Sequence, residues 1–187
     1  MKSRHAGLAV LLTITASTGF ARAQPADFAC PKPGTIEERG AYKAEYAGPS
    51  PGAPYLCNSV DTWNKPRALL FNFYNPNEVA TADVTNSLVD LFAGRTPSLT
   101  VNLKSGSIEK WTMLRREQVN IGGTSIEAIV FDEERWRFPS SLHPFHGHYT
   151  RWLDPKDGLW VKAESSDVSG ETARERKPYQ DTSIRFP

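Results

Sequence analysis

The chain has 187 residues, with 22 Lys and Arg against 21 Asp and Glu, and a formal net charge of +1. This balanced composition lacks the excess of basic residues that nucleic-acid binding or a polybasic membrane patch requires. With only two cysteines, the chain also lacks the paired clusters of a cysteine-based zinc site.

Residues 1–23 have the three parts of a secretory signal peptide. A basic start precedes an apolar run at 6–16, and the Ala-Arg-Ala stretch at 21–23 places small residues where a signal peptidase reads them. The apolar run is shorter than the roughly 20 residues of a membrane-spanning helix. We therefore expect cleavage before Gln24 and a protein that is periplasmic or secreted, with no membrane span.

The mature chain differs from the full chain in charge. Removing Lys2, Arg4 and Arg22 lowers the basic count from 22 to 19 against 21 acidic residues, which gives a formal charge of −2. The remaining 164 residues are enough for one domain with a substantial core. No nucleic-acid partner is expected.

Cys30 and Cys57 are the only cysteines. An even pair in an exported chain predicts a disulfide, because the compartment is oxidising. Two free buried thiols or a pair of metal ligands are the alternatives. A disulfide closing this loop would contribute about 3.5 kcal/mol by the loop-entropy model.

The first part of the mature chain, 24–66, is rich in Pro, Gly and small residues and shows little periodicity. It predicts an irregular N-terminal arm tied down by the disulfide, followed by a single β-rich domain at 67–187. The run from Arg67 to Tyr74 is apolar on both faces, which predicts a central, buried strand.

Residues 81–93 have helical spacing. Val84, Leu88, Leu91 and Phe92 lie at i, i+4, i+7 and i+8 and therefore share one face. Gly94 suits the left-handed position that follows a helix. We expect this helix to cover the sheet.

After the helix, the apolar pattern changes to period two, which is typical of strands with one buried face. In the second of these strands, Trp111, Met113 and Val119 are expected on the same face. Strands are predicted at 99–103, 109–119, 125–131, 148–153, 159–164 and 179–186, with a long loop or a mobile segment at 165–178. The predicted fold class is α+β: a curved antiparallel meander with one α-helix packed on it.

One hairpin carries a resemblance to known proteins. Trp152-Leu153-Asp154-Pro155 and Gly158-Leu159-Trp160-Val161 form a W-x-D-P-x-x-G-x-W-V hairpin, which resembles uncharacterised bacterial periplasmic β-sheet domains. The segment 98–164 is also distantly similar to the half-barrels of lipoprotein carriers. The resemblance implies a long antiparallel sheet that curls around a helix, and it carries over no functional residue.

Few residues suggest chemistry. The chain has no nucleophile elbow, P-loop, dinucleotide-binding or zinc-protease motif. His143, His146 and His148 lie within six residues and could bind a transition metal. The favoured interpretation is a polar loop that enters a strand. Since no fourth ligand is identifiable, no metal site is assigned.

The other polar and aromatic groups have simpler interpretations. The charged residues at 115–117 and 132–137 are interpreted as cross-strand partners on solvated faces. A catalytic carboxylate pair could be hidden among four acids, but nothing singles out two of them. The four are Glu127, Asp132, Glu133 and Glu134. The tryptophans are interpreted mainly as core residues, with a binding platform as the alternative.

The leading hypothesis is an exported, non-enzymatic envelope protein without cofactors or catalytic residues. Its curved sheet would bind a small apolar or amphiphilic ligand, or an envelope protein. The alternatives are a metal-dependent hydrolase that uses the cluster from His143 to His148, and a purely structural envelope protein. The ligand-binding residues are predicted to be Leu88, Leu91, Phe92, Trp111 and Met113.

Overall fold

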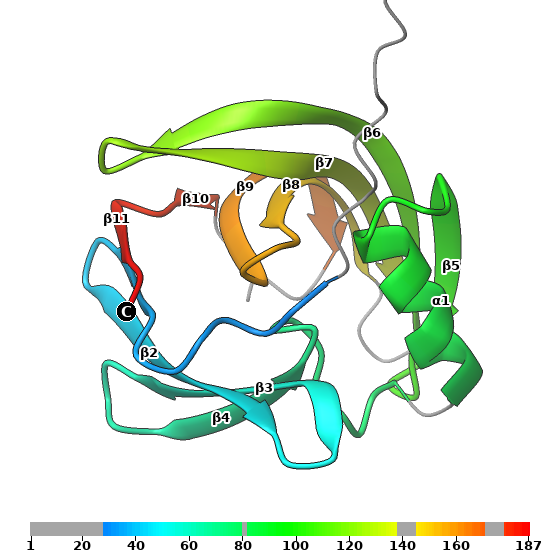
Figure 1. Ribbon diagram of the computed structural model, residues 1–187. Coiled ribbons are helices and arrows are strands. Elements are labelled where there is room, and N and C mark those ends of the chain that lie inside the picture. Colours follow the sequence, from blue (N-terminus) through cyan, green and yellow to red (C-terminus); the bar gives the residue numbers. More distant parts are fainter. Residues whose placement is uncertain (1–27, 80–81, 138–144, 171–177) are drawn as a thin grey trace, which may run out of the picture.

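The computed structural model describes residues 28–79, 82–137, 145–170 and 178–187. The predicted signal peptide at 1–23 lies outside the described residues. Two antiparallel sheets face each other, and a helix lies at one end of the space between them (Figure 1). This arrangement confirms the predicted fold class, which is mostly antiparallel β-sheet with one helix in the described part of the chain.

One sheet has five strands in the order β11-β1-β2-β3-β4. It combines the N-terminal part of the described chain with its last strand, because β1 pairs with β11. Its strands are β1 (Ile36–Arg39), β2 (Tyr42–Ser50), β3 (Ala53–Asp61), β4 (Pro66–Leu70) and β11 (Ser183–Arg185).

The other sheet has six strands in the order β10-β9-β8-β7-β6-β5, which is the predicted meander. The chain passes between the two sheets at Asp181 and Thr182: Asp181 N–H donates to Val161 on β9, and Thr182 N–H donates to Glu38 on β1. Its strands are β5 (Ser98–Asn102), β6 (Ser107–Ile121), β7 (Thr124–Arg137), β8 (Phe145–Asp154), β9 (Leu159–Gly170) and β10 (Tyr179–Gln180).

The prediction of an irregular arm at 24–66 is wrong, because β1, β2 and β3 lie within it. Burial alternates along β2 as it does in an ordinary strand, but small residues and tyrosines such as Ala44 and Tyr46 occupy the inward positions. Register shifts near Pro49 interrupt the ladder to β3. The usual aliphatic alternation is therefore missing from the sequence.

The prediction of a central strand from Arg67 to Tyr74 is also wrong. β4 ends at Leu70 and is the edge strand of its sheet. Phe71 and Asn72 then adopt left-handed φ angles of 54° and 53°, which are uncommon for residues other than glycine. The apolar character that predicted a buried strand belongs partly to this tight turn, where Phe71 is fully buried.

The helix α1 (Ala82–Phe92) confirms the predicted helix, although the first residue of the predicted range, 81, lies outside the described residues. Gly94 has a φ of +73°, as expected after a helix end. Leu88, Leu91 and Phe92 are fully buried, so the apolar face of the helix packs against the interior.

A β-bulge divides β6. The register to β7 shifts between Met113 and Arg115, which reverses the faces on which later residues lie. Trp111 therefore packs in one hydrophobic cluster and Val119 in another, and the prediction that they share one face is wrong. The C-terminal segment also differs from the prediction: β9 extends to Gly170, and 179–186 forms two short strands.

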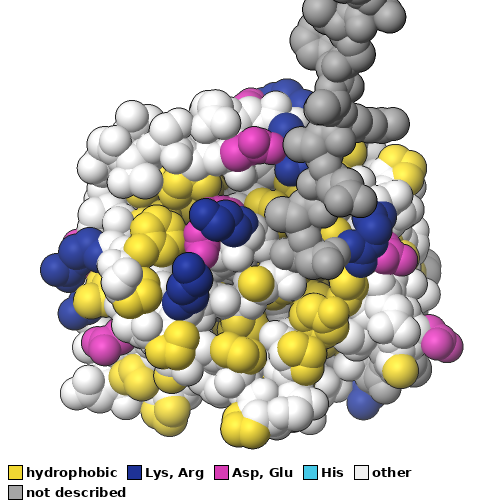
Figure 2. All heavy atoms as spheres, viewed as in Figure 1, with side chains coloured by type: hydrophobic (Ala, Val, Ile, Leu, Met, Phe, Trp, Pro, Cys, Tyr) yellow, Lys and Arg dark blue, Asp and Glu magenta, His cyan; other side chains and the backbone are white. Residues whose placement is uncertain are grey.

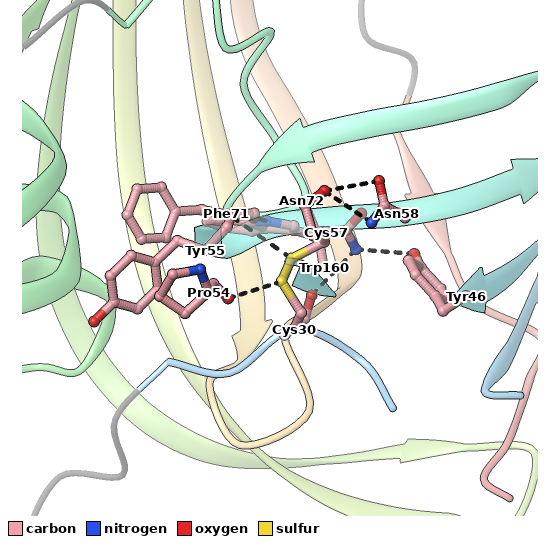
Figure 3. Close-up of a disulfide and its surroundings, with 11 residues drawn as sticks. Cys30, Tyr46, Pro54, Tyr55, Cys57, Asn58, Phe71, Asn72 and Trp160 are labelled. Carbon is pink, nitrogen blue, oxygen red and sulfur yellow. Dashed lines mark hydrogen bonds between the residues drawn. A yellow bond between two sulfur atoms is a disulfide. The ribbon is translucent and has the colours of Figure 1, made fainter. Parts of the chain in front are cut away.

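The predicted disulfide is present. Cys30 and Cys57 are bonded, and both are buried in the cluster that contains the helix (Figure 3). The bond fixes the segment before β1 to β3. Ala29 N–H also donates to Pro155 in the turn between β8 and β9, so the start of the described chain is held on two sides.

Candidate functional site

A cavity of about 370 Å³ lies between the inner face of the five-stranded sheet and residues of β8, β9 and β10. We call it the inner cavity. Its wall combines arginines with aromatic side chains. Glu37 contributes the single carboxylate of the wall. The lining residues are Glu37, Arg39, Tyr42, Tyr46, Ser59, Arg67, Leu69, Asn72, Phe73, Arg151, Trp160 and Tyr179.

A wider space of about 860 Å³, which we call the outer hollow, adjoins the inner cavity. The two share Arg39, Tyr42, Arg67 and Tyr179, so these residues form the passage between them. Trp63 also lines the outer hollow and is 64% exposed, with its ring centroid 6.5 Å from that of Tyr42. The site is thus a recess that opens to solvent past aromatic side chains.

Strand alternation places the lining residues. Glu37 and Arg39 are two residues apart on β1, as are Arg67 and Leu69 on β4, so each pair points to the same side of the sheet. On β2, Tyr46 lies on the same face as Tyr42, four residues earlier. The inner face of this sheet is therefore polar and aromatic.

The left-handed turn after β4 brings Asn72 and Phe73 to the inner cavity, while Phe71 is buried in the core. Phe71 N–H donates to Tyr55, and the Phe71 carbonyl accepts a hydrogen bond from the indole of Trp160 at 3.0 Å. The amide of Asn72 donates to the hydroxyl of Tyr46 at 2.9 Å (Figure 3). Unfavourable backbone conformations persist where surrounding contacts determine them, and they concentrate at functional sites.

Arg39 connects the two sheets. Its Nη2 donates to Glu37 Oε1, and its Nε lies 3.0 Å from Asp181 Oδ1. The guanidinium also lies 3.6 Å from the ring centroid of Tyr179 and 5.2 Å from that of Tyr42. Two carboxylates and two aromatic rings therefore fix its position at the passage.

Tyr46 and Arg67 are held by similar polar contacts. The Tyr46 hydroxyl donates to Glu37 Oε2, and burial raises the pKa of Tyr46 above its usual range. Arg67 pairs with Asp61 Oδ2 at 3.0 Å. Although burial acts to raise the pKa of Asp61, hydrogen bonds from the backbone of Lys65 and Trp63 and from Arg67 hold it below its usual value.

Arg151 is the most deeply buried arginine of the cavity wall, with 1% of its surface exposed. Its Nε donates to Glu133 Oε2, and the guanidinium lies 5.1 Å from the ring centroid of Phe73 and 4.9 Å from that of Tyr149. Burial opposes its charge, but Glu133 and other anionic groups raise the pKa of Arg151. Its Nη2 has no hydrogen-bond partner within the described structure.

Behind Arg151, a second polar cluster is buried in the core. Glu109 Oε2 accepts a hydrogen bond from the Tyr74 hydroxyl at 2.6 Å, and Glu109 Oε1 lies 3.3 Å from Arg135. The indole of Trp111 donates to the Tyr74 hydroxyl at 2.9 Å. None of these four residues lines the inner cavity or the outer hollow, so this cluster supports the core from outside the site.

The free energy of unfolding of the protein is expected to depend on pH through Asp181, which lies beside this site. Burial raises the pKa of Asp181 to about 7, even though Arg39 acts to lower it. Between about pH 4 and pH 7, the unfolded state loses its proton before the folded state does, so the free energy of unfolding falls as pH rises, by on the order of 1 kcal/mol per pH unit.

Urea unfolding of the wild type and Asp181→Asn, at pH 5 and at pH 7.5, measures this contribution. The wild type should lose more stability between the two pH values than Asp181→Asn does. An equal loss in both proteins would contradict the assignment.

The predicted ligand-binding residues lie elsewhere. Leu88, Leu91, Phe92 and Trp111 are fully buried and pack together with Met113 in the hydrophobic cluster around the helix. None of the five lines the inner cavity or the outer hollow. A ligand role for these five residues stays a prediction.

Two of the three clustered histidines can be placed, and His143 lies outside the described residues. His146 and His148 share a face of β8, and each contacts a carboxylate of β7: Glu134 at 3.3 Å and Asp132 at 2.7 Å. No group of three or more His, Cys, Asp or Glu side chains within the described ranges could hold a metal ion. The arrangement is two separate histidine–carboxylate pairs.

Sequence reasoning missed the arginines of the inner cavity. It also placed all of 132–137 on solvated faces, whereas Glu133 is fully buried. One signal was present: Arg151 lies two residues from Tyr149 and from Leu153, so an arginine occupies the buried face of β8. A lone arginine on such a face needs a buried partner or a ligand.

One face of the surface carries both hydrophobic and charged side chains (Figure 2). On the face shown in Figure 2, hydrophobic side chains gather around the middle and lower part, with Lys, Arg, Asp and Glu scattered among them singly or in small groups. Within the described ranges, no helix has the length and apolar character needed to span a membrane.

In the comparisons with known proteins, no family model, curated protein or solved structure matches this chain.

Proposed function

We propose that this chain is an exported, non-enzymatic protein that binds a small amphiphilic molecule in the inner cavity between its two sheets. One observation carries the proposal: the inner cavity brings five aromatic side chains and Leu69 together with fixed polar groups, and aromatic residues line its entrance. Ligand sites in proteins have this composition and are usually concave and already formed.

The size of the inner cavity supports a small ligand. Its volume of about 370 Å³ lies within the range of roughly 300–1,000 Å³ that is usual for small-molecule sites. The outer hollow can receive whatever part of the ligand extends beyond the passage. A protein partner would instead require a broad, flat surface of about 800 Å² on each side.

The polar groups at the passage support a site formed in advance. Arg39 is held by Glu37 and Asp181, and Arg67 is held by Asp61. Little side-chain entropy is then lost when a ligand binds, which favours affinity. The disulfide is typical of proteins from oxidising compartments, which supports export.

Filling the cavity should abolish binding. Leu69→Trp places a large ring on the cavity wall, and Leu114→Trp makes the same change at a residue that is 50% exposed and does not line the cavity. Binding of the neutral fluorescent probe N-phenyl-1-naphthylamine should weaken at least tenfold in Leu69→Trp and stay unchanged in Leu114→Trp.

Fluorescence titration of the mature protein measures this effect, and urea unfolding midpoints show that both variants are folded. Absence of probe binding to the wild type, or equal binding by both variants, would contradict a ligand site in the inner cavity.

A further inference from the structure

Arg151 has hydrogen-bonding capacity that the protein does not use. Its guanidinium can donate five hydrogen bonds in a fixed planar arrangement. Glu133 accepts from Nε, whereas Nη2 is buried without a partner in the described structure. Buried polar groups in native proteins are nearly always paired, so each exception needs an explanation. Since Arg151 lines the inner cavity, a ligand is one candidate for the missing partner.

The charges that line the inner cavity favour an anion. Arg39, Arg67 and Arg151 line it, and Glu37 is the one acidic residue in its wall. Asp61 and Glu133, which pair with Arg67 and Arg151, do not line it, whereas Glu37, which pairs with Arg39, does. A ligand in the cavity therefore meets guanidinium groups first.

The three arginines are not equivalent. Arg39 contacts two carboxylates and Arg67 contacts one, and both lie at the passage, where the outer hollow also reaches them. Arg151 lines the inner cavity but not the outer hollow. It is therefore the arginine placed to bind the charged end of a ligand that enters through the passage.

The walls near Arg151 are apolar. Phe73 and Trp160 contact each other, with ring centroids 5.0 Å apart, and both line the inner cavity. Leu69 lines it from β4, and Tyr42 and Trp63 continue the aromatic surface into the outer hollow. A ligand with its charged end at Arg151 would place an apolar body along these side chains.

We propose that the inner cavity binds an apolar carboxylate, with the carboxylate paired to Arg151 and the apolar body directed toward the passage. Charged hydrogen bonds of guanidinium to carboxylate are strong and geometrically specific. This inference rests on the proposed function and adds the chemical class of the ligand. The apolar body can be alkyl or aryl, and the experiment separates the two.

The experiment uses ligands matched in shape and different in charge. Octanoate is compared with octanol, and 2-naphthoate with the neutral 2-naphthol, by displacement of N-phenyl-1-naphthylamine from the mature protein at pH 7.5. At least one of the carboxylates should bind tenfold or more tightly than its neutral counterpart. The pair that shows this preference identifies the body as alkyl or aryl.

Variants assign the preference to Arg151. Arg151→Lys keeps a positive charge beside Glu133 but loses the guanidinium geometry. The preference for the carboxylate over its neutral counterpart should therefore fall about tenfold. Arg135→Lys makes the same change at an arginine that is paired with Glu109 outside the site, and it should keep the preference. The double variant Arg151→Met with Glu133→Gln leaves no unpaired buried charge and should abolish the preference.

The outcomes separate this inference from the proposed function. If the neutral probe binds but neither carboxylate is preferred by the wild type, the inner cavity is a ligand site and the carboxylate inference is wrong. If the preference survives in the double variant, Arg151 does not bind the anion. If the probe does not bind to the wild type, the proposed function itself fails.

Discussion

Replacing Phe92 with alanine is expected to lower the free energy of unfolding by about 3–5 kcal/mol, the usual range for a buried phenylalanine. Its ring is fully buried at the end of α1, where it packs against the six-stranded sheet and the turn after β4. Ring centroids lie 5.2–6.3 Å from it in Phe28, Phe71, Trp111, Phe131 and Trp160.

Denaturant unfolding of the purified chain from Gln24 onward measures the loss. Phe186→Ala is the matched control, because Phe186 is 40% exposed and should lose less than 1 kcal/mol. Leu88→Ala should cost about 2–5 kcal/mol, since Leu88 is also fully buried. Small losses for both Phe92→Ala and Leu88→Ala would contradict this expectation. They would mean that this helix face borders an open ligand space, as the prediction of Leu88 and Phe92 as ligand-binding residues requires.

Breaking the disulfide is expected to have a comparable effect. Cys30 and Cys57 are 27 residues apart, and the loop-entropy model gives about 3.5 kcal/mol for a loop of this length. The bond also holds Phe28 and Cys30 in the hydrophobic cluster around α1. The unfolding free energy of the reduced protein should therefore fall by about that amount relative to the oxidised protein.

Two measurements check this expectation. Alkylation of denatured, unreduced protein should label neither cysteine, and urea unfolding with and without reductant gives the stability difference. The double variant Cys30→Ala with Cys57→Ala, with and without reductant, controls for effects of the reductant on the rest of the protein. Labelling without reduction would exclude the bond in the isolated protein.

The parts of the fold that the sequence predicted carry local signals. Helix α1 has a clear apolar face and a glycine after its end. The turn between β6 and β7 uses Gly122 and Gly123, both with positive φ, and the turn between β8 and β9 ends at Gly158 with a φ of +61°. Each of these signals lies within a few residues of the element that it defines.

The parts that the sequence did not predict depend on distant pairings. The strands β1, β2 and β3 have few aliphatic residues, and β1 is completed by β11 from the other end of the chain. The bulge near Leu114 has no signature in the apolar pattern of β6. A single sequence read by local periodicity does not contain these pairings.

The candidate site depends even more on contacts between residues that are distant in the sequence. Arg39 and Asp181 are ion-paired although 142 positions separate them in the sequence, and Arg151 reaches the inner cavity from a different sheet than Arg39 does. Periodicity can show that an arginine lies on a buried face. It does not show which other residues the fold brings to that arginine.

The pairing of β1 with β11 has a consequence for how the chain folds. Ile36 lies opposite Arg185, so this sheet cannot be completed until residues 183–185 have been synthesised. Such high contact order slows folding, and until β11 docks, β1 presents an unpaired edge on which other chains can add. Completion of this sheet therefore waits for β11, and removal of residues 183–187 should favour aggregation.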